Sequence, residues 1–286
     1  MKNDRLKDFI SLTKPRLNLL AIFTTLAGFY MGSAGPLNGR LLLFTLLGSV
    51  GVAAGCGVLN QWFEVESDGR MNRTKSRPLP AGRLPSRQAF WFGLVLSVVG
   101  LWILLYQVNE LTSYLGMTAL VSYIVFYTPL KKITSLCTVV GAIPGAMPPL
   151  MGYAAVQNQI GFEGWTLFSI LFFWQMPHFL SIGWIYREDY AKAGFPMLSV
   201  IDPEGETTGW VAVVYAMALL PISLLPTYLK MTGPVYFWIA LVLSLFFLWF
   251  SAGLVRMRTL TQARKLFLVS IIYLPLLFIA MALNKI

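Results

Sequence analysis

The sequence predicts an all-α protein that crosses a membrane many times. Residues of the AVILMFWYC set make up 57% of the 286 residues, and charged residues make up only 12%, where soluble domains carry about 25%. Mean hydropathy is +0.67, and the apolar residues form long unbroken runs rather than alternating strands. This composition excludes a soluble enzyme, a disordered chain and a transmembrane β-barrel.

Nine apolar runs are long enough to span the hydrocarbon layer as helices, which takes about 20 residues. They lie at 17–33, 41–63, 89–107, 111–128, 135–155, 165–186, 210–229, 235–254 and 266–283. Two long polar connections, 64–88 and 187–209, follow the second and the sixth run. We expect one membrane-embedded domain over residues 1–286, with nine helices around a central cavity and a cytoplasmic cap formed by these two loops.

Lysine and arginine gather on one side of the predicted bundle. If the N-terminal tail and every second loop share a side, that side holds 19 of the 22 basic residues, and the other holds only Arg40, Lys230 and Lys285. Because basic loops stay in the cytoplasm, the pattern predicts a multi-pass protein of the cell membrane with a cytoplasmic N-terminus and an external C-terminus. The net charge of +10 therefore reflects membrane orientation and not nucleic-acid binding.

Acidic residues are scarce, and three of the twelve lie together at the end of the second run. Asn60, Glu64 and Asp68 are spaced four residues apart, so a continuous helix would place them along one face, about 6 Å apart in rise. Mg²⁺ prefers such oxygen ligands and is usually held by one or two carboxylates together with substrate phosphates.

Basic residues that can pair with phosphate oxygens follow this cluster along the chain. They are Arg73, Lys75 and Arg77. The pattern favours a site for a diphosphate held through magnesium. The alternative is a solvated helix end, whose charges pair with each other and with anionic lipid.

A second acidic cluster follows the sixth run, on the same predicted side. It contains Glu188 and Asp189, next to Arg187. Two acidic clusters that face one cavity could hold two or more Mg²⁺ ions around one diphosphate and stabilise the charge of the leaving group. Loss of pyrophosphate from an allylic chain leaves a carbocation, which an apolar, aromatic cavity would shelter from water.

Several longer motifs resemble those of the UbiA superfamily of intramembrane aromatic prenyltransferases, over nearly the whole chain. The first motif of that superfamily resembles Asn-x-x-x-Asp-x-x-x-Asp, and here Glu64 stands at its middle position. Within the superfamily, the sequence is most similar to the branch that acts on protohaem IX. The matching segments are Leu12-Thr13-Lys14-Pro15-Arg16, Asp68-x-x-Met71-x-Arg73-Thr74-x-x-Arg77-Pro78-Leu79, Tyr127-Thr128-x-Leu130-Lys131-Lys132, Gly145-Ala146-x-Pro148-Pro149-Leu150-x-Gly152, Trp174-Gln175-Met176-Pro177-His178-Phe179 and Asp189-Tyr190-x-x-Ala193-Gly194-x-Pro196-Met197-Leu198.

This resemblance implies an enzyme that takes farnesyl diphosphate as donor and protohaem IX as acceptor, converts a vinyl group into a hydroxyethylfarnesyl group and releases pyrophosphate. It implies Mg²⁺ as cofactor, the lipid bilayer as surroundings and a haem A synthase as a candidate partner. The catalytic residues it implies are Asn60, Glu64, Asp68 and Asp189. The metal ligands are these four and Glu188, and the choice between Glu188 and Asp189 as main ligand stays open. The diphosphate ligands are Arg73, Lys75, Arg77, Lys131, Lys132 and Arg187.

His178 is the only histidine in the sequence and lies inside the sixth run beside Pro177. An ionisable group at this depth is costly and usually faces a cavity or a partner, and haem iron is commonly held by histidine. One hypothesis is therefore a contact between His178 and haem. The alternative is a neutral imidazole bonded to a backbone carbonyl that Pro177 leaves without a donor.

Three other functions compete with this interpretation. A prenyltransferase of the same fold could act on a quinone precursor such as a hydroxybenzoate, although the Gln175 to His178 segment argues against it. A transporter would place its charges near mid-membrane, whereas these charges cluster at one face. A haem-binding protein without catalysis would need His178 but not the acidic clusters.

Overall fold

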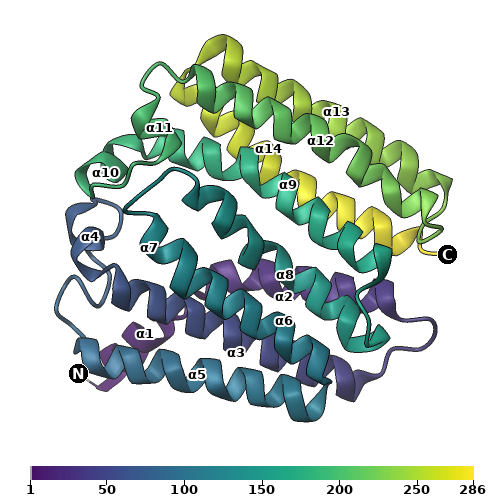
Figure 1. Ribbon diagram of the computed structural model, residues 1–286, viewed down its shortest axis with the longest axis horizontal. Coiled ribbons are helices and arrows are strands. Elements are labelled where there is room, and N and C mark those ends of the chain that lie inside the picture. Colours follow the sequence, from purple (N-terminus) through teal and green to yellow (C-terminus); the bar gives the residue numbers. More distant parts are fainter. Residues whose placement is uncertain (1) are drawn as a thin grey trace.

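The structure, a computed structural model, describes residues 2–286, and its regular elements are fourteen α-helices and one π-helix. They are α1 (Lys2–Leu12), α2 (Pro15–Gly32), α3 (Gly39–Phe63), α4 (Val65–Arg70), α5 (Ser86–Gln107), α6 (Glu110–Val121), η1 (Ser122–Tyr127), α7 (Thr128–Leu130), α8 (Cys137–Gln157), α9 (Gly161–Ile185), α10 (Arg187–Lys192), α11 (Leu198–Ile201), α12 (Glu206–Tyr228), α13 (Pro234–Met257) and α14 (Leu260–Leu283). The long helices run side by side as a bundle (Figure 1). The all-α prediction is confirmed.

Each of the nine predicted apolar runs forms a helix. Within the described residues, eight segments are long and apolar enough to cross a membrane, and one of them, Glu110–Leu130, joins α6, η1 and α7. The helix of the first run, α2, has 18 residues but is less apolar than these eight. Its first turn carries Arg16 and Asn18, which lower its hydropathy. The predicted count of nine spans is therefore supported for eight helices.

The helices α2 and α8 pack at very close range. A Cβ atom on Gly28 would lie 1.9 Å from the carbonyl oxygen of Pro149, and one on Gly152 would lie 2.0 Å from the carbonyl oxygen of Thr25. Only glycine fits at both positions, since small residues let membrane helices approach this closely. The contact holds α2, and with it the α1–α2 corner, against the middle of the bundle.

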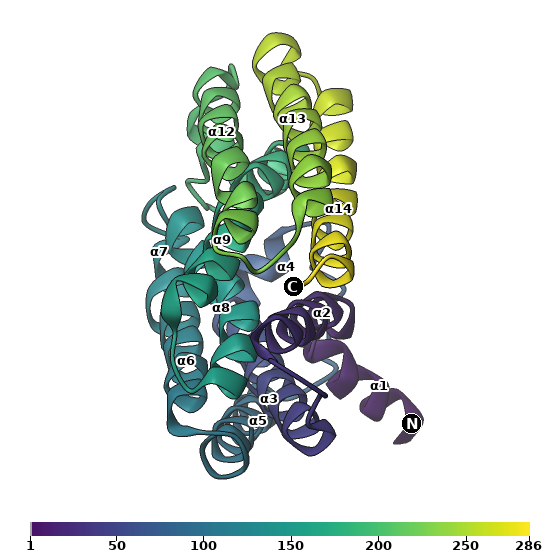
Figure 2. The same cartoon turned by 90° about the vertical axis from the view of Figure 1, so that its right-hand side faces the viewer.

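Different parts of the chain lie at the two ends of the bundle. The N-terminal helix α1, the short helices α4 and α10 and the connection after α7 lie at one end, and the C-terminus lies at the other (Figure 1). At the C-terminal end, Lys285 donates to the carbonyl oxygens of Tyr30 and Ser33 and so joins the last residues to α2. Figure 2 shows the C-terminus beside α2.

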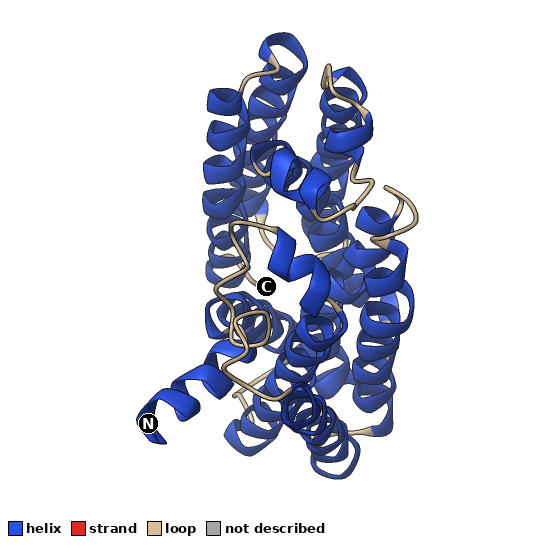
Figure 3. Ribbon diagram, turned by 90° about the vertical axis from the view of Figure 1, so that its left-hand side faces the viewer, coloured by secondary structure: helices blue, strands red, loops and turns tan. Residues whose placement is uncertain are grey.

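Two connections pack against each other at the end that carries the N-terminus. We call them the loop cap, which consists of residues 64–85, with α4, and residues 186–205, with α10 and α11. An apolar cluster of Met71, Tyr190, Ala193 and Phe195 joins them. Figure 3 looks onto this end, with the short helices nearest the viewer. The two long polar loops thus meet over one end of the bundle.

A π-helix that the sequence did not predict interrupts the fourth run. It is η1, and Thr128 donates both its backbone N–H and its hydroxyl to the carbonyl oxygen of Tyr123, five residues earlier. Such wide turns occur frequently at functional sites. Here the wide turn comes shortly before Lys131, a residue of the site described next.

Candidate active site

Asn60, Glu64 and Asp68 form the first cluster of the site. Asn60 lies in the last turn of α3, Glu64 at the junction with α4, and Asp68 within α4. The expected continuous helix breaks at Glu64, but bonds from Glu64 N–H to Asn60 O (3.0 Å) and from Asp68 N–H to Glu64 O (2.8 Å) keep the four-residue spacing. Only 3%, 2% and 1% of the three residues' surfaces are exposed, so this helix end is not solvated as the alternative expected, although its charges do pair with each other.

The two carboxylates of the first cluster each have a cationic partner. Lys131 Nζ lies 2.9 Å from both carboxylate oxygens of Glu64, and Arg77 Nη1 lies 2.7 Å from Oδ2 of Asp68. Burial disfavours the charged form of Lys131, but the adjacent carboxylate of Glu64 outweighs this effect and raises the pKa of Lys131. Lys131 therefore keeps its charge although it is buried.

Lys14 adds a third cation, and the sequence did not single it out as a site residue. Its Nζ donates to Oδ1 of Asn60 at 3.0 Å. Burial, together with the nearby charge of Arg77, lowers the pKa of Lys14 to about 8. The backbone of Lys14 is in the left-handed region (φ 52°, ψ 57°) directly before Pro15, where the chain turns from α1 into α2. A lysine rarely adopts this conformation, which is often found at functional sites.

The oxygens of the first cluster fit a magnesium ion that a substrate helps to hold. Oδ1 of Asp68 is buried and has no hydrogen-bond partner in the structure. A buried acceptor without a donor is costly, so this oxygen offers an open position to a cation. Within residues 2–286, no three His, Cys, Asp or Glu side chains converge to form a complete metal cage. Mg²⁺ needs no such cage, because one or two carboxylates and substrate phosphates usually suffice.

Asp189 is the centre of the second cluster and closes the loop cap. Its two carboxylate oxygens accept the backbone N–H groups of Asn72 (3.3 Å) and Arg73 (3.2 Å), in the segment that follows α4. Asp189 is buried, whereas the neighbouring Glu188 is exposed. The structure therefore brings Asp189, and not Glu188, against the loop that carries the first cluster.

The predicted diphosphate ligands fall into two groups. Arg77 and Lys131 contact the carboxylates of the first cluster, and Arg73 donates to the Tyr190 hydroxyl at 3.3 Å. The other three make contacts elsewhere, and none of the six is among the residues that line the central cavity. Lys75 donates to Asn72 Oδ1 at 3.1 Å, the Lys132 ammonium lies 5.7 Å from the ring centroid of Phe63, and Arg187 donates to the carbonyl oxygen of Pro203 at 3.3 Å.

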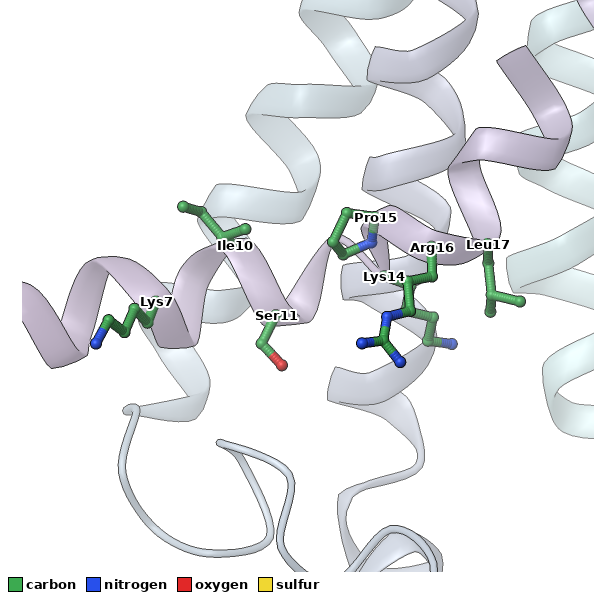
Figure 4. Close-up of a pocket in the computed structure, with 7 residues that line it drawn as sticks. All are labelled: Lys7, Ile10, Ser11, Lys14, Pro15, Arg16 and Leu17. Atoms are coloured by element: carbon green, nitrogen blue, oxygen red, sulfur yellow. The ribbon is translucent and has the colours of Figure 1, made fainter. Parts of the chain in front are cut away.

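A central cavity of about 360 Å³ opens beside Lys14 and extends into the bundle. Lys14 lines both this cavity and a surface groove at the corner of α1 and α2, which Figure 4 shows. Tyr190 lines the cavity near the loop cap, and His178 on α9 lines it as well. Most other lining residues are apolar or aromatic, and Tyr123 and Tyr127 of η1 are among them. One space thus extends from Lys14, the one Lys, Arg, Asp or Glu among the described residues that line it, to an aromatic interior.

His178 contacts a side chain and not the backbone. Its Nδ1 lies 2.7 Å from Oγ of Ser270 on α14. The imidazole stacks against Trp174 and against Phe267, with ring centroids 5.0 Å and 5.2 Å away. The alternative of a carbonyl partner near Pro177 is therefore wrong.

The bundle, with its buried polar cluster at one end of an apolar cavity, has the architecture of an intramembrane prenyltransferase. The profile of the UbiA prenyltransferase family matches residues 21–281. The chain belongs to this family. It is 44% identical to the protoheme IX farnesyltransferase of Solibacter usitatus, over 98% of this chain and 99% of that protein. It is 43% identical to the protoheme IX farnesyltransferase of Myxococcus xanthus, over 98% of this chain and 95% of that protein.

Two solved structures share the fold. A digeranylgeranylglyceryl phosphate synthase has a TM-score of 0.82 at 20% identity, with 98% of both chains covered. A UbiA homologue from Archaeoglobus fulgidus, bound to GPP and Mg²⁺, has a TM-score of 0.68 at 14% identity, with 96% of this chain and 99% of that chain covered. The helical architecture expected from the motifs is confirmed.

Proposed function

We propose that this protein transfers a farnesyl group from farnesyl diphosphate to a vinyl group of protohaem IX. The observation that carries the proposal is the single cavity that joins Lys14, beside the buried first cluster, to His178. The names of the relatives at 43% and 44% identity support the same donor and acceptor.

The diphosphate of the donor binds at the loop-cap end of the cavity. Lys14, Arg77 and Lys131 supply positive charge there, and arginine can hold phosphate oxygens in a bidentate way. Asn60, Glu64 and Asp68 are the residues that would hold Mg²⁺, and the Archaeoglobus homologue bound to GPP and Mg²⁺ supports the use of this metal. When bound, Mg²⁺ neutralises the diphosphate and stabilises the charge on the leaving pyrophosphate.

The prenyl chain lies in the apolar part of the cavity. When the allylic C–O bond breaks, its electron pair leaves with pyrophosphate and a carbocation remains on the chain. The rings of Tyr123 and Tyr127, 5.0 Å apart, line this space and can stabilise the positive charge through their π faces. The loop cap, which Asp189 closes, keeps bulk water away from the carbocation until the acceptor reacts.

The acceptor lies on the His178 side of the cavity. The allylic carbon forms a new C–C bond with the terminal carbon of the haem vinyl group, water adds to the other vinyl carbon and one proton is released. These steps convert the vinyl group into a hydroxyethylfarnesyl group. His178 and Trp174 line this part of the cavity. A haem A synthase, which would take the product, is the partner to seek by co-purification.

The experiment is an assay of the purified protein with farnesyl diphosphate and protohaem IX, with and without Mg²⁺. We expect farnesylated haem and pyrophosphate only when Mg²⁺ is present. Prenylation of a hydroxybenzoate but not of haem would assign the protein to quinone synthesis. Haem binding without any prenyl transfer would indicate a haem-binding protein without catalysis. Either of these two results would contradict the proposal.

We also propose that the loop cap faces the cytoplasm, because the loops at that end carry 19 of the 22 basic residues. Ser76 and Thr207 are exposed near this end, and Ala34 is exposed in the α2–α3 connection at the other. The native Cys56 and Cys137 are buried, so they add little background. An impermeant thiol reagent should label Ser76→Cys and Thr207→Cys only from the cytoplasm and Ala34→Cys only from outside. The reverse pattern would overturn the orientation.

A further inference from the structure

Ser270 on α14 makes three hydrogen bonds that together fix the surroundings of His178. Its hydroxyl donates to the carbonyl oxygen of Phe267 at 2.6 Å, and its Oγ lies 2.7 Å from Nδ1 of His178. Its carbonyl oxygen accepts the indole N–H of Trp174 at 2.9 Å. Ser270 therefore holds His178 through its side chain and Trp174 through its backbone.

The directions of the hydrogen bonds at Ser270 determine the tautomer of His178. A hydroxyl has a single proton, and here the carbonyl of Phe267 takes it. The Ser270 oxygen can then only accept a hydrogen bond from His178, so the proton of the neutral imidazole is on Nδ1. Nε2 carries the free lone pair, and it has no hydrogen-bond partner among the described residues.

Three aromatic rings surround the imidazole of His178. Trp174 and Phe267 stack against the ring with interplanar angles of 18° and 25°, and Phe179 is tilted against it by 55°. Ser270 occupies Nδ1, and His178 itself lines the central cavity. A metal ion bound to Nε2 would lie in the plane of the imidazole, so a porphyrin around it would meet the edge of this ring. Edge-to-face contact is a favourable geometry for aromatic systems.

We propose that Ser270 is a positioning residue, which holds His178 in the Nδ1–H tautomer so that Nε2 binds the iron of the haem substrate. This proposal rests on the proposed function. A neutral imidazole whose other nitrogen donates to a fixed acceptor is the usual form of a metal-binding histidine, and that acceptor sets the orientation and basicity of the ring. A serine that served only to satisfy its own helix would need the bond to Phe267 alone.

The test compares haem binding by four purified full-length proteins, titrated with ferric haem and followed by the Soret band and by electron paramagnetic resonance. They are the wild type, His178→Ala, Ser270→Ala and Ser251→Ala. Ser251 is the matched control, because it is a buried serine on α13 that donates to the carbonyl oxygen of Phe247 at 2.9 Å and does not line the cavity. Melting temperature and farnesyl diphosphate binding are measured for each protein.

We expect His178→Ala to abolish the signature of histidine ligation. Ser270→Ala should weaken haem binding by about 10–100-fold, the usual effect of removing the acceptor behind a metal-bound histidine. It should also alter the resonance spectrum of the bound haem, whereas Ser251→Ala should leave both unchanged. Ser270→Thr, which keeps the hydroxyl, should restore the wild-type spectrum. Haem affinity and spectrum in Ser270→Ala equal to those of Ser251→Ala would overturn the proposal.

A second measurement applies even where Ser270→Ala does not fold. Because His178 is the only histidine, ¹⁵N-histidine labelling of wild-type protein with a histidine-free affinity tag gives one pair of ring signals. We expect Nδ1 to be protonated, and a proton on Nε2 would contradict the proposal. Failure of the enzyme to farnesylate haem, with these binding results intact, would instead disprove the proposed function.

Discussion

The two carboxylate clusters at the loop-cap end of the bundle are held in different ways. In the first cluster, Glu64 and Asp68 pair with the side chains of Lys131 and Arg77, and one oxygen of Asp68 has no hydrogen-bond partner among the described residues. In the second cluster, both oxygens of Asp189 accept backbone N–H groups. Side-chain cations can exchange one anion for another, whereas backbone donors hold a fixed position. We propose from this difference that the first cluster binds ligands and that the second fixes the loop cap around them.

Replacing Asp68 should break the first cluster and have the largest effect. We expect Asp68→Ala to lower prenyl transfer by about 100–1000-fold, since a charged group arranged around a developing charge contributes this much. Glu66→Ala is the control, because Glu66 is exposed on the same short helix α4 and should leave activity within about twofold. Turnover is measured in purified protein of verified melting temperature. Normal turnover in Asp68→Ala, or undiminished wild-type turnover in excess EDTA, would disprove the metal assignment.

Substitutions of the neighbouring residues Asp189 and Glu188 test the role of the second cluster. Asp189→Asn keeps the size of the side chain but replaces one carboxylate oxygen, an acceptor, with an amide NH₂ group, a donor. This NH₂ group would face the backbone N–H of Asn72 or Arg73, which is also a donor. We expect it to lower turnover by about 10-fold, the cost of one lost charge-assisted bond. Glu188→Gln should change turnover by less than about twofold, because Glu188 is exposed. A larger loss in Glu188→Gln than in Asp189→Asn would assign the main role to Glu188.

Lys14 tests whether the first cluster extends to the α1–α2 corner. We expect Lys14→Ala to raise KM for farnesyl diphosphate by about 5–10-fold with a smaller change in kcat, because it removes one cation from the diphosphate end of the cavity. Lys7→Ala is the matched control, since Lys7 is exposed on α1 and lines only the surface groove. Steady-state kinetics at fixed haem concentration distinguish the two variants. Equal KM values in both would exclude Lys14 from the site.

The smallest effect is expected far from both clusters, at the C-terminal end of the bundle. Lys285→Ala removes the ammonium that donates to Tyr30 and Ser33. It should lower the free energy of unfolding by about 1 kcal/mol, or the melting temperature by about 2 °C, without changing turnover. A thermal melt and an activity assay on the same sample check this. Lost turnover at unchanged melting temperature would show that the two ends of the bundle are coupled.

The nine helices and the two acidic loops were predictable because their signals are local. A long apolar run forms a helix in a membrane regardless of the rest of the sequence, and the few carboxylates are easily recognised in a chain of this composition. The break at Glu64 and the wide turn of η1 were not predictable, because both depend on packing against other helices. The same holds for Lys14 and Ser270, whose partners Asn60 and His178 lie 46 and 92 residues away in the sequence.

The wide turn of η1 also determines where Lys131 points. Each residue of an α-helix advances the chain by about 100° around the axis, and a π-helical turn contains one residue more than an α-helical turn. Deleting one apolar residue between 122 and 127 would restore regular helical winding and still leave a membrane span of about the same length. The same deletion would rotate Lys131 by about 100° relative to the residues before η1, away from Glu64. One extra residue in the turn of η1 thus sets the direction of the buried charge that pairs with Glu64.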